Sequence, residues 1–325
     1  MKTSKFFSMI GVAAMALALA ACSNDETVEQ GGKQAISFKA FVNKNIKNAR
    51  SVTELSSVSN FYVFGNLGAD AQNYTDRIFN NELQSTPYYW SPNKSYIFGA
   101  YADGEGGKID NATFDEKQGV LTFADYTVND GKDLIAAVAT TTTDADVTNK
   151  QPLGLTFNHM LSQLRFTFTT DEGENSTLKI SDLNVSIDQK GTCTYKDGGT
   201  PTVTWVNANN KTALAYAEVA DVAVTEKKAA TESHLVIPQT EPQNIEVTFK
   251  ATFTTPGYAP IEGTFKTTLA YNTNQGWQAG YRYNYSVKLN AADIDPTIQQ
   301  KKIEFTPTVE SWENAAEGST TPQKQ

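Results

Sequence analysis

The chain has 325 residues, of which 39% are hydrophobic and 19% are charged, as expected for a globular protein with two domains or one large β domain. Its formal charge of −9 argues against a nucleic-acid partner, because phosphate binding needs a basic face. The 17 Phe and 14 Tyr, with many β-branched residues, favour sheet over helix.

The first 22 residues resemble a signal for export and lipid attachment. Two lysines precede an apolar run from Phe6 to Ala21, which is too short and too rich in small residues for a good membrane span. The run ends in "LAAC", similar to a bacterial lipobox, in which the cysteine is acylated and becomes the new N-terminus. An ordinary secretory signal with a chance cysteine is the alternative. Residues 1–22 are therefore expected to be a lipoprotein signal, with Cys22 as the lipid anchor.

Residues 23–50 combine a polar tether with a first strand. The stretch "AISFKAFV" alternates in polarity, and the linker that follows it contains Arg50, so that Arg50-Ser51 is a typical site for proteolytic nicking. The alternative is an ordinary solvated loop arginine. Arg77 lies in a possible loop, whereas Arg165 and Arg282 lie in predicted strands. The four apolar side chains of the first strand that share one face are Ile36, Phe38, Ala40 and Val42.

Short alternating strands with turn signals between them continue through the rest of the chain and are typical of β-sandwiches. No stretch has a convincing amphipathic helical pattern. The polar segment from Thr140 to Gly154 is the expected domain boundary. We therefore expect an N-terminal sandwich over residues 51–150 and a C-terminal sandwich over residues 151–325.

The C-terminal stretch "KKIEFTPTVESWE" repeats the spacing of the first strand, and Trp312 follows as a possible anchor. Either strand fits a groove with pockets two residues apart. Proline cannot donate to a ladder and therefore suits an edge or an added strand. The alternative is that both are simply edge strands of one monomer. The alternating residues near 301–312 are Ile303, Phe305, Pro307 and Val309.

The sequence contains no recognisable catalytic constellation, so we expect no enzyme activity, no cofactor and no metal. Acylation of Cys22 would leave Cys193 alone, without an intramolecular disulfide. His159 and His234 are flanked by apolar strand residues and are expected to be structural. Asp144 and Asp146 are expected in a solvated loop, with weak calcium binding as the alternative.

Several motifs together resemble the fimbrillin family of Bacteroidales, the major and tip pilins. The match covers nearly the whole chain and rests on the order and spacing of individually weak motifs. They are the lipobox, "ISFKAFV" with Arg50 after it, "FYVFG", "YYWSPNKSYIFGAYA", "LTFNHMLSQLRFTF", "LVIPQT", "GWQAGYRYNYSVKL" and "IEFTPTVESWE".

The resemblance implies an all-β fold of two tandem transthyretin-like β-sandwich domains. It also implies a lipoprotein of the outer membrane surface that is cut by an arginine-directed protease and then assembles with other fimbrial subunits through strand donation. The residues implied are Arg50 and Ser51 for processing, the first strand for displacement, and the strand from Ile303 to Val309 with Trp312 for donation. The resemblance covers stalk, tip and anchor subunits alike.

The competing hypothesis is a monomeric surface lipoprotein, or a pilus tip or anchor, that binds a glycan or a host protein. Its candidate residues are the exposed aromatics expected at Tyr88, Tyr89 and Trp90. Three consecutive aromatics must face both sides of a strand, so the favoured interpretation places two of them in the core.

Overall fold

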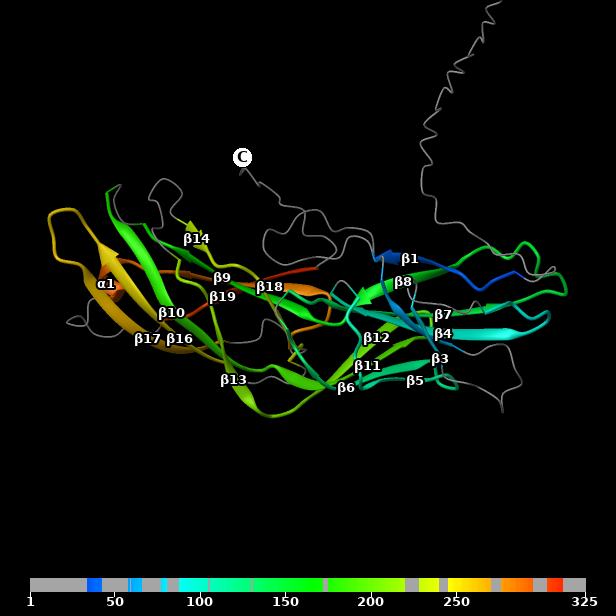
Figure 1. Cartoon of the computed structure of the whole chain (residues 1–325). Helices are drawn as coiled ribbons and strands as arrows, with labels where there is room; N and C mark the ends of the chain where they lie inside the picture. The colour runs from blue at the N-terminus through cyan, green and yellow to red at the C-terminus, as the bar shows by residue number, and fades with distance from the viewer. Residues whose placement is uncertain are drawn as a thin grey trace, which may run out of the picture.

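The structure, a computed structural model, contains almost entirely β-strands in the part of the chain that it describes. One short helix, α1 (Ala291–Ile294), accompanies them there. The expected all-β class is confirmed, and the strands form two sandwiches in tandem along an elongated molecule (Figure 1). Cys22, Arg50, Ser51 and Trp312 lie outside the described residues. The structure describes residues 34–42, 58, 60–65, 77–80, 88–104, 106–129, 131–171, 175–219, 228–239, 245–269, 276–294 and 303–311.

The first sandwich pairs a six-stranded sheet with a four-stranded one. The larger sheet has the order β1 (Phe38–Val42), β8 (Leu153–His159), β7 (Leu134–Thr142), β4 (Ser95–Asp103), β2 (Tyr62–Gly65) and β3 (Arg77–Asn80). The smaller sheet has the order β12 (Pro201–Asn207), β11 (Lys190–Asp197), β6 (Val120–Thr127) and β5 (Ala112–Asp115).

The second sandwich pairs a four-stranded sheet with a five-stranded one. The four-stranded sheet has the order β13 (Lys211–Ala215), β10 (Thr177–Asp188), β16 (Ile245–Thr254) and β17 (Ile261–Leu269). The five-stranded sheet has the order β14 (Lys228–Ala230), β9 (Ser162–Thr169), β18 (Tyr281–Lys288) and β19 (Thr306–Ser311), and β15 (His234–Val236) also pairs with β9.

Alternation along the strands divides the buried side chains into three cores. In β4, Tyr101 faces the four-stranded sheet and belongs to an inner core with Phe123 and Trp205. Phe98, also in β4, points to the opposite face and belongs to what we call the outer core. The second sandwich has its own core between its sheets. The outer core consists of Ile36, Val42, Phe61, Val63, Trp90, Tyr96, Phe98, Ala100, Ala102, Ile135, Ala137, Val147, Leu155 and Phe157.

Strand pairing does not follow the boundary expected at residue 150. β8 pairs with β7, and β11 pairs with β6, so strands on both sides of residue 150 belong to the first sandwich. The physical reason is that β6 offers one edge to β5 and its other edge to β11, and the second edge needs a partner. The chain therefore leaves the first sandwich after β8, returns for β11 and β12, and leaves it again.

Candidate functional site: the two terminal strands

β1 lies as an outer strand on β8 and covers the outer core. The two strands are parallel, with Phe38 opposite Leu153 and Val42 opposite Phe157. Two residue pairs, at the His159 end, join β8 to β7, so the beginning of β8 diverges from that strand. In Figure 1, β1 and the start of β8 form a ribbon above β7 and β4. β1 therefore holds its place through one neighbouring strand and through the side chains beneath it.

The apolar face predicted for the first strand points into this outer core. Ile36 and Val42 are buried, and Phe38 and Ala40 pack against the cluster. The Phe38 ring lies edge-on to Phe98, with 5.0 Å between ring centroids. Such aromatic pairs add about 0.5–1.5 kcal/mol to the energy of area burial. The four side chains thus close one side of a packed cluster.

The aromatic triplet before β4 belongs mainly to the same cluster. Trp90 is 2% exposed and lies edge-on to Tyr96, 4.7 Å between centroids. Tyr88 packs against the outer core, and its carbonyl accepts a hydrogen bond of 2.6 Å from the Ile36 amide. Tyr89 is half-buried and forms an isolated bridge with Ala35. The triplet is therefore tied to the first strand, and this placement favours the core interpretation over a ligand-binding face.

The C-terminal strand is seated in the second sandwich. β19 runs antiparallel to β18, with Pro307 opposite Tyr285 and Val309 opposite Tyr283. Just before β19, Ile303 and Phe305 are 8% and 9% exposed. The Phe305 ring contacts those of Phe166, Phe168 and Phe249, with centroids 5.4–6.1 Å apart.

The predicted alternation of Ile303, Phe305, Pro307 and Val309 is therefore present as a buried or half-buried face. The structure places this face and the face of β1 in different sandwiches, and the two sets do not meet. Of the arginines considered for cleavage, Arg165 and Arg282 lie in strands as predicted, within β9 and β18. The loop predicted around Arg77 is wrong, because Arg77 begins β3 and pairs with Gly65.

Comparison with known proteins assigns a family. The fimbrillin-like family matches residues 35–312, which is most of the chain. The chain belongs to the fimbrillin-like family. No curated protein matches it.

Solved structures with a similar fold cover most of this fimbrillin-like chain. A fimbrial protein from Bacteroides vulgatus is 16% identical, with a TM-score of 0.51, and the match covers 78% of this chain and 92% of that one. A protein from Bacteroides uniformis, named for a proposed role in cell adhesion, is 16% identical with a TM-score of 0.45. That match covers 86% of this chain and 98% of the other.

Cys193 and the two histidines of this fimbrillin-like chain lie in packed surroundings. Burial raises the pKa of the Cys193 thiol. His159 Nδ1 lies 2.7 Å from Asp133 Oδ2 in a buried pair, and the His234 ring lies edge-on to Tyr216.

Among the described residues, His, Cys, Asp and Glu nowhere gather in groups of three that could hold a metal. No described helix has the length and apolar character needed to cross a membrane.

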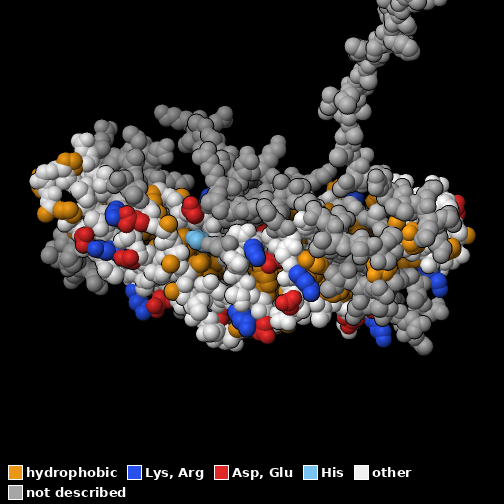
Figure 2. All heavy atoms as spheres, in the orientation of Figure 1, with side chains coloured by type: hydrophobic (Ala, Val, Ile, Leu, Met, Phe, Trp, Pro, Cys, Tyr) orange, Lys and Arg blue, Asp and Glu red, His pale blue; other side chains and the backbone are white. Residues whose placement is uncertain are grey.

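Charges on the surface are mixed in sign. Figure 2 shows acidic and basic side chains interspersed on the face in view. Several form exposed pairs, such as Lys250 with Glu262 at 2.9 Å and Lys266 with Glu246 at 2.7 Å. Exposed pairs of this kind contribute little to stability but keep the surface polar.

Sequence reasoning did not identify the surface that receives β1. Leu155 and Phe157 in β8 are fully buried beneath it, and Phe61 lies 5.6 Å from Phe157, centroid to centroid. The signal was present in the alternation of "LGLTFNH", but alternation does not reveal which of two faces a residue lines.

Proposed function

We propose that this fimbrillin-like protein is a structural subunit of a cell-surface fimbrium that contributes to adhesion. In this proposal Cys22 carries the lipid to the outer membrane, and an arginine-directed protease then cuts between Arg50 and Ser51. Subunits polymerise when the C-terminal strand of one molecule replaces β1 of another. The observation that carries the proposal is the position of β1, an outer strand that covers the outer core from one edge.

Loss of β1 would leave a costly surface. The outer core would lose its cover over Phe98 and Phe157, and β8 would lose its ladder partner along Leu153–Phe157. Burial of each large apolar side chain is worth about 1.5–3 kcal/mol, and unpaired backbone groups away from water add further cost. A strand with the same two-residue apolar period would restore both, as in strand complementation between other subunits.

The C-terminal strand has the required period. Ile303, Phe305, Pro307 and Val309 alternate with polar residues, as Ile36, Phe38, Ala40 and Val42 do in and before β1. Pro307 lies in β19, at the end of its sheet, where proline is tolerated. Donation would exchange burial in the strand's own sandwich for burial in a neighbour's, with Trp312 as an anchor beyond the strand.

Processing is tested on the secreted precursor. An arginine-specific protease should yield one stable product that begins at Ser51, and this product should oligomerise while the precursor stays monomeric. N-terminal sequencing, mass spectrometry and size-exclusion chromatography give the readout. A precursor that resists cleavage at Arg50, or that is cut at Arg77 alone, contradicts the processing step.

Donation is tested by a reversible lock on β19. Ser286 and Thr306 are opposite each other in β18 and β19, so the double variant Ser286→Cys/Thr306→Cys should form a disulfide that holds β19 in its own sandwich. The oxidised, processed variant should remain monomeric, and reduction should restore oligomers. Thr248→Cys/Lys266→Cys joins β16 to β17 and serves as the control that leaves assembly intact. Equal assembly of the oxidised and reduced β19 variant would exclude donation by this strand.

The second candidate is a monomeric surface lipoprotein, or a tip or anchor subunit, that binds a glycan or a host protein. The observation that favours it is that Ile303 and Phe305 are already buried within their own molecule. A processed, unlocked protein that remains monomeric at high concentration would support this candidate over the polymerising subunit.

A further inference from the structure

β12 is a seven-residue outer strand without a charged residue. A sheet edge presents unpaired backbone groups, and proteins commonly protect such edges with charged side chains, especially lysine. The two ends of the four described sheets give eight strands, and seven of these contain a charged residue. β12, with the sequence "PTVTWVN", contains none. The three-residue strand β15, which pairs only with β9, is a further outer strand and contains none. The charged residues are Lys39 in β1, Arg77 in β3, Asp115 in β5, Lys211 in β13, Lys228 in β14, Glu262 and Lys266 in β17, and Glu310 in β19.

The register of β12 shows which backbone groups it offers. The Ala208 amide donates to the Lys190 carbonyl over 2.9 Å, and Gly191 is opposite Asn207. Ladder bonds in an antiparallel pair alternate, so Thr204 and Val206 exchange their bonds with β11, whereas the N–H and C=O groups of Val203 and Trp205 point to the open edge. Within the described residues, no hydrogen bond satisfies these edge groups of Val203 and Trp205.

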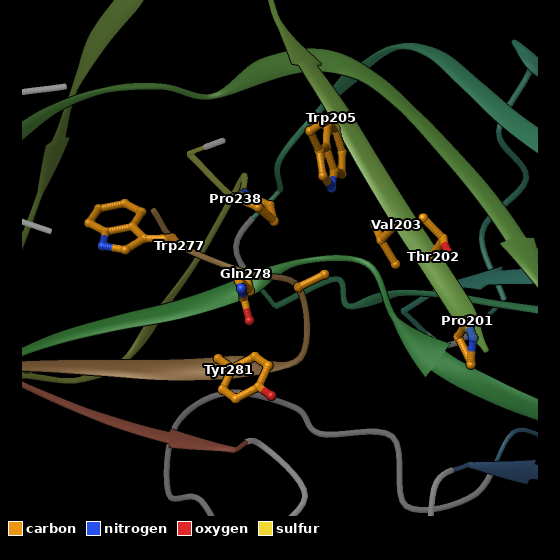
Figure 3. A pocket seen from close by; sticks show the side chains of 9 residues that line it. Pro201, Thr202, Val203, Trp205, Pro238, Trp277, Gln278 and Tyr281 are labelled. Carbon is orange, nitrogen blue, oxygen red and sulfur yellow. The ribbon is translucent and has the colours of Figure 1, made fainter. Parts of the chain in front are cut away.

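A hollow of about 580 Å³ lies beside this edge, within the usual size range of ligand pockets. Figure 3 shows Thr202, Val203 and Trp205 of β12 on one side and Pro238, Gln278 and Tyr281 across from them. The hollow therefore lies between the first sandwich and the loop that precedes β18. Its lining has no acidic or basic side chain; the residues are Pro201, Thr202, Val203, Trp205, Pro238, Trp277, Gln278, Ala279 and Tyr281.

The far wall of the hollow is held close to one end of β12. Asn207 Nδ2 donates to Gln239 Oε1 over 3.1 Å, and the Gln239 carbonyl accepts from the Trp277 amide over 3.0 Å. An added strand lies about 4.8 Å from its neighbour, and the sheet of a second molecule would need further strands beyond that distance. The space beyond the added strand is taken up by Pro238 and by the segment from Trp277 to Tyr281. One extended segment therefore fits beside β12 more readily than a second sheet.

We propose that the open edge of β12 binds a single extended, uncharged peptide segment of another protein as a fifth strand of this sheet. Backbone bonds to Val203 and Trp205 would provide the affinity, in the manner of β-strand addition. The neutral lining would select against charged side chains, because a charge there would be desolvated without a partner. On the outer face the added strand would cover Val206, which is 68% exposed. The surface is separate from β1, so the proposal does not depend on strand donation.

The test uses the whole mature chain and a synthetic uncharged peptide, acetyl-Ser-Thr-Val-Thr-Val-Thr-Ser-amide. Amide hydrogen exchange should slow at Val203 and Trp205 when the peptide is added, whereas Thr204 and Val206, already bonded to β11, should change little. The same peptide with lysine in place of both valines should bind at least tenfold more weakly.

Variants of β12 provide matched controls. Val203→Pro removes an edge donor whose N–H does not bond to β11, and it should weaken peptide binding about tenfold, the effect of one lost hydrogen bond. Thr204→Ala trims an exposed side chain in the same strand and should leave the affinity within about twofold. Thermal unfolding of both variants verifies that the sheet is retained.

Three outcomes would overturn the proposal. The first is unchanged exchange at Val203 and Trp205 with saturating peptide. The second is protection without peptide that grows with protein concentration, which would assign the edge to a second copy of this chain. The third is protection without peptide that is independent of concentration and disappears when residues 312–325 are removed, which would assign it to the chain's own C-terminal segment.

Discussion

At the scale of single residues, Asp103 shows how burial affects a charge inside the first sandwich. Burial raises its pKa, a hydrogen bond of 3.0 Å from the Tyr126 hydroxyl opposes this, and the charge of Asp133 adds to the rise. When folding raises the pKa of a carboxyl, the folded state favours its protonated form. The stability of the protein therefore falls as the pH rises through that pKa. Asp103→Asn keeps an acceptor for Tyr126 and should raise the free energy of unfolding at pH 7, with a smaller gain below pH 4. Urea denaturation of the variant and the parent protein, at pH 7 and below pH 4, measures this difference in the free energy of unfolding.

Asp146 is the matched control, because its pKa is shifted in the opposite direction from that of Asp103. Its pKa is lowered because it accepts hydrogen bonds from the Thr148 hydroxyl and amide, at 2.7 Å and 2.9 Å. The stabilisation is present at neutral pH and is lost as the pH falls through the lowered pKa. Asp146→Asn should therefore destabilise at pH 7 and have less effect in acid. The same direction of pH dependence in both variants would contradict this account.

At the scale of elements, β1 should open locally before the rest of its sheet. It has one strand neighbour, whereas β4 lies between β2 and β7. Phe38→Ala removes a half-buried ring from Phe98 and should cost about 2 kcal/mol, below the 3–5 kcal/mol of a fully buried phenylalanine. Exchange of the β1 amides should then become about 30-fold faster, while that of the β4 amides stays unchanged.

Lys39→Ala, on the exposed face of β1, is the control for Phe38→Ala. It should leave exchange in β1 within about twofold, because it removes no side chain from the outer core. It removes only the contact of the Lys39 ammonium group with the Phe41 ring, 5.5 Å from its centroid on the exposed face. Equal acceleration of β4 by Phe38→Ala would show that β1 does not open separately.

The two sheets of the first sandwich approach closely at Gly99 in β4. A Cβ atom there would lie 2.5 Å from the Phe114 ring and 3.0 Å from Leu121. Gly99→Ala should therefore overpack the inner core and destabilise the protein by about 1–3 kcal/mol. Gly154→Ala in β8 is the control, because its nearest neighbour is the edge of the Phe41 ring at 3.5 Å, an ordinary contact. Chemical denaturation compares the two, and equal stabilities would refute the close approach.

At the scale of the whole molecule, alternation predicted the fold class and the inward faces of both terminal strands. Val42 and Phe305 point inward as their spacing indicates. Alternation could not predict the partner of each strand, because a period of two gives a face and not a neighbour. The return of β11 and β12 to the first sandwich depends on the open edge of β6, which only the assembled sheet reveals. For the same reason the polar segment near residue 150 resembles a linker without separating the sandwiches.

The interleaved chain path predicts that the two sandwiches unfold together. The chain crosses between them after β8, β10 and β12. Hydrogen bonds gather where the chain passes from β8 to β9. Trp205 Nε1 donates to the Met160 carbonyl over 2.8 Å, and the Gly280 amide donates to the Leu161 carbonyl over 2.9 Å. Leu235, beside β9 of the second sandwich, contributes its side chain to the inner core of the first.

Calorimetry of the whole chain should therefore give one transition, with a calorimetric enthalpy equal to the van't Hoff enthalpy. The fragment 51–150 should remain unfolded by circular dichroism, because it lacks β8, β11 and β12 and leaves the edge of β6 and much of the inner core uncovered. Two separate transitions, or independent folding of fragments 51–150 and 151–325, would contradict this coupling. Trp205→Phe keeps an aromatic side chain but removes the indole N–H that bonds to Met160, together with part of the buried ring. It should lower the transition temperature as a whole, without splitting it, if the crossing joins the sandwiches into one cooperative unit.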